Sequence, residues 1–284
     1  MKNETVGQQT TAIYKPVRVI YFTDPICSSC WVIEPELRKL KLEYGDYFDF
    51  EYHMGGLVPS WSSLDPRGIK ELSYIAHHWN EVSQRYGMAI DGDIWLEDPL
   101  HSSYPPSIAF IAAKMQDNKK ADAFLRRIRE MVFLEKKNIT RWEYLQQAAL
   151  ETGLEVERFH RDYEGQANDL FEADLGFAKS NNVRGFPTLF FLNGEGRQEM
   201  VYGYHSYDHL ENIILSLVPW IEKSSHEHSA QGIFDHYPSI ATKEFSVITN
   251  QATQDSERIL EDLVKRDIVE KILTPNGPYW KKRR

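Results

Sequence analysis

Cys27 and Cys30 are the only cysteines in the 284 residues, and they lie where a strand pattern gives way to a helix pattern. Residues 17–22 before the pair are β-branched and aromatic, which is typical of a buried strand. Apolar residues recur at helical spacing over 37–44. A cysteine at a helix N-terminus meets the positive end of the helix dipole and free backbone amides, which lower its pKa. Because the thiolate attacks disulfides, the pair predicts thiol–disulfide exchange.

Other roles for the pair fit less well. A structural zinc site takes four ligands, and the chain has no second C-x-x-C. A structural disulfide here would close a loop too short to restrict the unfolded chain much. A redox-shaped fold that keeps its cysteines but serves as a binding platform remains open. We therefore expect no metal. The histidines considered, none at a spacing that points to this turn, are His53, His77, His78 and His101.

Composition limits the partners. The net charge is −9, which argues against broad binding to nucleic acid or to a membrane surface. The first 15 residues are polar and lack the apolar core of a secretory signal, and no apolar run reaches transmembrane length. We expect a cytoplasmic protein with a cycling dithiol rather than a permanent bridge. No phosphate loop or dinucleotide fingerprint occurs in the sequence, so we expect no cofactor.

The chain is predicted to have an α/β organisation. Residues 1–15 are expected to be a flexible lead, and residues 16–222 one domain with a β-α-β start and a β-β-α end. Between these, about 58–182 shows helical patterns only, including a predicted capping box of Thr140 and Glu143. Strands are expected over 48–54 and as a hairpin around Asn193-Gly194.

A small separate unit is expected over 233–284, after a polar linker over 224–232. Helices are predicted near 240–249 and from Asp255 onward, followed by a hairpin around 275–278. This order resembles a winged helix. A DNA-binding role is not expected, because acidic and basic residues alternate on the second helix.

Three motifs resemble the DsbA-like branch of the thioredoxin superfamily, and most closely its FrnE-type dithiol-disulfide isomerases. They are Asp24-Pro25-Ile26-Cys27-Ser28-Ser29-Cys30-Trp31, then Gly55-Gly56-Leu57, and Val183-Arg184-Gly185-Phe186-Pro187-Thr188. The resemblance covers about three quarters of the chain. It implies a thioredoxin-like fold with a helical insertion.

The resemblance also implies roles for single residues. Cys27 would be the attacking thiol and Cys30 the resolving thiol, with Pro187 a cis-proline facing them. The residues implied to bind substrate are Trp31, Gly185, Phe186, Pro187 and Thr188. For Trp31 an ordinary packing role is an equal alternative. Asp24 is a candidate proton acceptor for the resolving cysteine, although an aspartate before Pro25 also suits a turn.

The expected function is that of a protein dithiol-disulfide oxidoreductase acting on protein thiols, with glutathione or a similar thiol as a candidate cosubstrate. The two residues between the cysteines are Ser28 and Ser29. Strongly oxidising relatives carry a histidine there, so the direction of electron flow stays open.

A second resemblance supplies the alternative function. Adaptors of the YjbH/SpxH type for the ClpXP protease share the DsbA-like body, a segment similar to 136–140, and a small C-terminal unit ending in a motif like Tyr279-Trp280-Lys281. The resemblance implies that the body binds a client protein and delivers it to ClpXP without catalysis. The 233–284 unit supports this alternative, whereas Gly55-Gly56-Leu57 favours the oxidoreductase.

Overall fold

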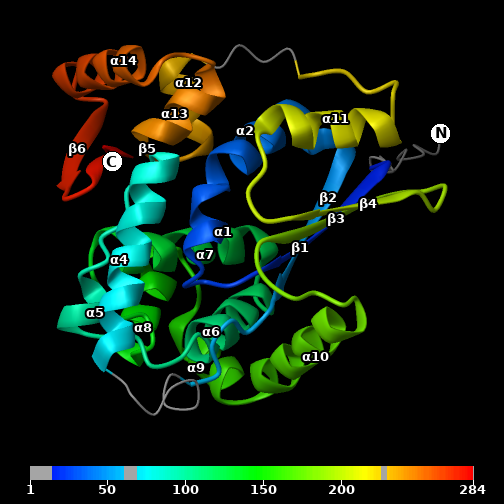
Figure 1. Ribbon diagram of the computed structural model, residues 1–284, viewed down its shortest axis with the longest axis vertical. Coiled ribbons are helices and arrows are strands. Elements are labelled where there is room, and N and C mark those ends of the chain that lie inside the picture. The colour runs from blue at the N-terminus through cyan, green and yellow to red at the C-terminus, as the bar shows by residue number, and fades with distance from the viewer. Residues whose placement is uncertain (1–14, 61–68, 225–228, 284) are drawn as a thin grey trace, which may run out of the picture.

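A computed structural model of the chain describes residues 15–60, 69–224 and 229–283 (Figure 1). The larger sheet has the order β2 (Phe48–Met54), β1 (Val17–Thr23), β3 (Thr188–Asn193) and β4 (Gln198–Tyr202). β1 runs parallel to β2 and antiparallel to β3, and β3 pairs antiparallel with β4. The predicted second strand and the predicted hairpin are therefore confirmed.

The two faces of this sheet are buried separately, because side chains alternate along a strand. Tyr21 of β1 points into the main core with Leu37 of α2 (Glu34–Tyr44) and Leu210 of α11 (Tyr207–Leu217). Phe22 points the other way and packs with Phe177 of α10 (Gln166–Ser180). The dithiol segment, α1 (Ser28–Val32), leaves the end of β1 and passes into α2.

The expected insertion is helical throughout its described part. Its helices are α4 (Ile69–Tyr86), α5 (Ile94–Glu97), α6 (Tyr104–Lys114), α7 (Asn118–Leu134), α8 (Trp142–Glu151), α9 (Val156–Glu164) and α10. The predicted capping box of Thr140 and Glu143 is wrong. α8 begins one residue later than that box requires, with Arg141 as N-cap, because the Thr140 hydroxyl is bound to Asn138 and His101 instead.

The C-terminal module comprises α12 (Ala230–His236), β5 (Ser239–Ala241), α13 (Thr242–Thr249), α14 (Thr253–Lys265), β6 (Val269–Thr274) and β7 (Gly277–Lys282). Its antiparallel sheet has the order β5-β7-β6. Two boundaries differ from expectation. α12 starts inside the predicted linker, because Ser229 caps it and Phe234 is buried in the core of the module. The predicted helix 240–249 begins with the short strand β5.

The C-terminal module packs on the thioredoxin-like body. α13 lies against α2, and the two are seen side by side in Figure 1. The Asn276 side chain, at the tip of the β6–β7 hairpin, donates to Asn80 of α4. Within the described ranges, we find no helix with the length and apolar character needed to span a bilayer. The expected lead over 1–15 lies almost wholly outside the described residues.

Candidate functional site

Cys27 is the N-cap of α1. Its backbone is extended, and its sulfur accepts a hydrogen bond from the backbone N–H of Cys30 at 3.3 Å. Both cysteines are free thiols. The side chain of Cys27 is therefore held at the N-terminus of the helix, as the sequence predicted. The helix is short, because Ile33 separates it from α2.

The Phe186–Pro187 peptide bond is cis, as expected. The Cys27 thiol donates to the Phe186 carbonyl oxygen at 3.6 Å, so the loop before β3 lies beside the dithiol. Gly55 lies against the ring of Phe186 at the same place. A Cβ at that position would lie 1.9 Å from Cζ of Phe186, so only glycine accommodates the ring there. The three motifs of the sequence thus meet at one place.

The two thiols differ in solvent exposure and in the direction in which their pKa values are shifted. Cys27 is 6% exposed and Cys30 is 0% exposed, so Cys27 is the more accessible of the two. The hydrogen bond with Cys30, together with burial, raises the pKa of Cys27 well above its usual value. For Cys30, burial is outweighed by the hydrogen bond with Cys27 and by the charge of Arg129, so its pKa is lowered. The two thiols share one hydrogen bond, so the pKa of one is raised as that of the other is lowered, and which of them ionises first stays a prediction.

Arg129 is the site residue that the sequence reasoning missed. It projects from α7, is 1% exposed, and donates to Thr23 Oγ1 and to Glu34 Oε1, both at 2.6 Å. A second contact reaches the Asp24 carbonyl oxygen at 3.4 Å. An arginine among the apolar residues on the buried side of an amphipathic helix was the available signal, because such a charge is buried only with partners.

Asp24 is fully buried at the end of β1. Its carboxylate accepts from the backbone N–H groups of Ile26 at 3.0 Å and Leu57 at 2.8 Å. Burial raises its pKa to about 6, although these bonds and Ser103 oppose the shift. Asp24 therefore both forms the turn and keeps a carboxyl group that titrates near neutral pH. Its role as a proton acceptor stays a prediction.

The residues implied to bind substrate are not equally available. Trp31 is fully buried: its indole N–H donates to the Ala89 carbonyl, and its ring stacks on Phe133. A contact between Trp31 and a substrate is therefore excluded in this arrangement, and the packing alternative holds. Pro187 and Thr188 are also buried, whereas Gly185 and Phe186 are half-buried beside Cys27.

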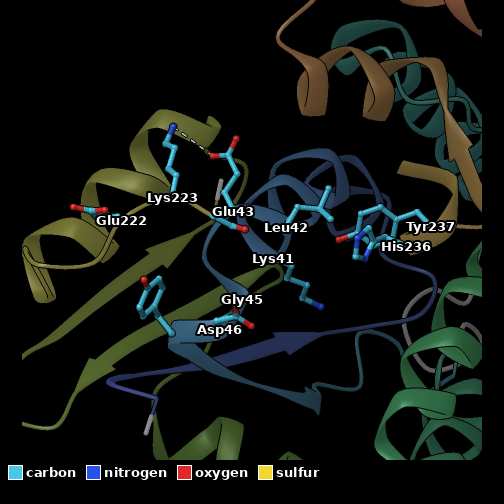
Figure 2. Close-up of a pocket in the computed structure, with 11 residues that line it drawn as sticks. Lys41, Leu42, Glu43, Gly45, Asp46, Glu222, Lys223, His236 and Tyr237 are labelled. Carbon is cyan, nitrogen blue, oxygen red and sulfur yellow. Dashed lines mark ion pairs between the residues drawn. The ribbon is translucent and has the colours of Figure 1, made fainter. Parts of the chain in front are cut away.

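A cavity of about 670 Å³ lies away from the dithiol, between α2 and the C-terminal module. Figure 2 shows it bordered by Lys41 and Glu43 on one side and by His236 and Tyr237 on the other. Glu43 forms an ion pair with Lys223 across part of its wall. The predicted site residues do not line this cavity, so it is separate from the dithiol site.

The sequence and the fold of this chain are similar to those of known proteins. Residues 21–212 match the family model described as Thioredoxin. The ClpXP adapter protein SpxH of Halalkalibacterium halodurans is 32% identical over 275 residues, which cover 94% of this chain and 89% of that protein. SpxH of Bacillus subtilis is 32% identical over 272 residues, with the same two shares.

The solved structures that resemble this chain cover a smaller part of it. A putative protein disulfide isomerase from Nitrosomonas europaea superposes with a TM-score of 0.62 at 19% identity, covering 72% of this chain and 98% of that one. The cytosolic disulfide reductase DsbM from Pseudomonas aeruginosa has a TM-score of 0.54 at 25% identity, covering 65% and 88%. The fold is thus thioredoxin-like with DsbA-like neighbours. The chain belongs to the thioredoxin family and, within it, to the family of the SpxH adapter proteins.

Proposed function

We propose that this chain is an adaptor for the ClpXP protease, which binds a client protein and presents it for degradation. The observation that carries the proposal is the extent of the similarity. The SpxH relatives match 94% of the chain, which leaves too few residues unmatched to omit the C-terminal module. The redox structures match 65–72%, close to the share that residues 16–222 make up. The proposal places the protein in the cytoplasm, as the sequence suggested.

The state of the dithiol also supports a binding role. An attacking thiol needs exposure and a lowered pKa. Cys27 is 6% exposed, and its pKa is raised. Trp31 and the half-turn that carries it are buried, so little of α1 is open to a substrate. The thioredoxin-like body is therefore better suited to present a fixed surface than to turn over disulfides.

The test begins with protein half-lives measured in the native host. A strain lacking this chain should stabilise a small set of proteins that are also stabilised when ClpX is absent. Each such protein is then purified and incubated with ClpXP and ATP, with and without this chain. The adaptor should accelerate degradation at less than one equivalent per client, because it is released after each delivery.

The matched control is the Cys27→Ser/Cys30→Ser variant, which removes thiol chemistry without a change of fold. An adaptor that works by binding should retain its effect on the client with both sulfurs gone. The proposal is wrong if no protein is stabilised in common, or if the purified chain leaves every degradation rate unchanged.

We infer a second candidate function, thiol–disulfide exchange with protein thiols or a small thiol such as glutathione. It is favoured by the contact of Cys27 Sγ with the Phe186 carbonyl and with the Cys30 amide. Reduction of insulin by the wild-type chain, measured against Cys30→Ser, tests it. Turnover that depends on Cys30 would support the exchange, and rates equal to the variant's would exclude it.

A further inference from the structure

A buried charge cluster joins the dithiol site to the C-terminal module. It comprises the arginines Arg38, Arg126 and Arg129 and the glutamates Glu34, Glu130 and Glu244. The side chains of all six are between 0% and 11% exposed. Five come from α2 and α7 of the body, and only Glu244 comes from the module. With Glu244 the charges of these six balance, and without it one positive charge is left over.

Glu244 is held on three sides. Its two carboxylate oxygens accept from Arg126 at 2.8 and 2.9 Å, which is a bidentate pair. Arg38 approaches the same carboxylate at 3.2 Å, and the backbone N–H of Ala241 donates to it at 2.7 Å. The side chain is 0% exposed, so its charge is not screened by water.

The other end of the cluster is Arg129, which lies next to Cys30. Glu34 binds Arg129 at 2.6 Å and faces Arg38 at 3.9 Å, so it is shared between an arginine of the dithiol site and an arginine bound to the module. Arg126 makes a second contact between the charge cluster and the dithiol segment, because its guanidinium lies 4.4 Å from the ring of Trp31, the residue after Cys30.

We propose that Glu244 is a positioning residue for the dithiol. It balances the arginine charge behind Cys30, so that docking of the C-terminal module sets how readily the dithiol ionises. The inference does not depend on adaptor activity, since it concerns a property of the thiols themselves. Loss of the Glu244 charge would leave an excess positive charge in the buried interior, and a positive charge favours a thiolate. Arg38 would stay in place, because it also donates to the Ser239 carbonyl at 2.8 Å and lies 4.4 Å from the Tyr237 ring centroid.

Other groups face the same thiols and act in both the wild type and the variants. Around Cys30 these are Tyr21, Asp24, Cys27, Glu34 and Arg129. The helix α4 also packs against α1, and its buried residues are Ala76, Trp79, Val82 and Ser83. Around Glu244 the further groups are Glu36, Tyr237, Lys243 and Tyr279. Beside the rest of the cluster lie Arg127, 3.7 Å from Glu130, and the pair Lys41 and Asp122 near Glu34, which are also unchanged in the variants.

The experiment is a charge series in the full-length chain. The variants are Glu244→Gln, Arg38→Gln and the double variant, and the reading is the thiolate ultraviolet absorbance as a function of pH. Glu244→Gln should lower the titration midpoint of the dithiol by about half to one pH unit, as one unbalanced buried charge would. Arg38→Gln should raise the midpoint, and the double variant should return to the wild-type value.

The control is Glu270→Gln, an exposed glutamate of β6, which should titrate as the wild type does. Opposite shifts that cancel in the double variant cannot come from a loss of packing, because packing defects would add. Near-ultraviolet circular dichroism of the full chain, compared with that of the wild type, shows whether the variants keep the native aromatic packing. The proposal is wrong if the single variants leave the midpoint unchanged, or if both shift it in the same direction and the double variant shifts it further.

Discussion

Replacing Asp24 by asparagine should change how stability depends on pH. The carboxyl group is fully buried, and burial raises its pKa from 3.8 to about 6 in the folded chain. The asparagine has nearly the same shape and keeps an oxygen that can accept from Ile26 or Leu57. The change therefore removes the titration and leaves most of the packing in place.

The sign follows from which state holds the proton. Between pH 3.8 and about 6 the folded chain keeps the Asp24 proton and the unfolded chain has lost it. The contribution of Asp24 to stability is therefore fully present below pH 3.8 and is lost as pH rises through about 6. At about 1.4 kcal/mol per pH unit, the shift corresponds to a loss of about 3 kcal/mol by pH 7.

Urea unfolding of the wild type and of Asp24→Asn at about pH 4, 5, 6 and 7 measures this. The free energy of unfolding of the variant, relative to the wild type, should rise by about 2.5 kcal/mol across the series, because the unfolded carboxyl group is already more than half ionised at pH 4. The difference between the two proteins is the useful quantity, because other groups titrate in both. A flat difference for Asp24→Asn would refute the reasoning.

Three further outcomes are expected. Gly55→Ala should lower the free energy of unfolding by about 1–3 kcal/mol in urea titrations, because the new Cβ would displace the Phe186 ring from which it lies 1.9 Å. Alkylation at neutral pH, read by peptide mass spectrometry, should modify Cys27 before Cys30, since Cys30 is 0% exposed and access decides the rate. Deletion of 225–284 should lower the melting temperature and reduce the free energy of unfolding by about 1–3 kcal/mol, because the buried arginines of the charge cluster lose Glu244. A truncated chain as stable as the full chain would contradict this.

Local patterns were sufficient to predict the parts of the fold that depend on neighbouring residues. The alternation over β2, the Asn-Gly turn and the strand-to-helix change at the dithiol all appear in the structure as expected. The position of the cis-proline Pro187 beside the dithiol was predicted through a family resemblance, whereas the contact of Cys27 with Phe186, across 159 positions, leaves no local pattern and was not predicted.

Capping and linker chemistry was less predictable. Thr140 had a competing partner in Asn138, and the polar segment before Phe234 supplied a cap from Ser229 rather than a flexible linker. In both cases a polar side chain had more than one local acceptor or donor available. Which one it takes depends on what the tertiary packing places nearby.

The acidity of the dithiol depends on more than the local rule for a helix N-terminus. The helix dipole was expected to favour a thiolate on Cys27, but α1 ends at Val32 and α2 starts at Glu34 with Pro35 in its first turn. A five-residue helix offers only a small dipole effect, about 0.3–1 kcal/mol at best in exposed settings. Against burial, the hydrogen bond with Cys27 is the larger cause that lowers the pKa of Cys30, and the charge of Arg129 adds to it. Negative charge on the dithiol is therefore drawn inward, toward α7 and the charge cluster, and away from the surface where a substrate would meet Cys27. This arrangement agrees with the proposed adaptor function, in which the dithiol need not attack an outside disulfide.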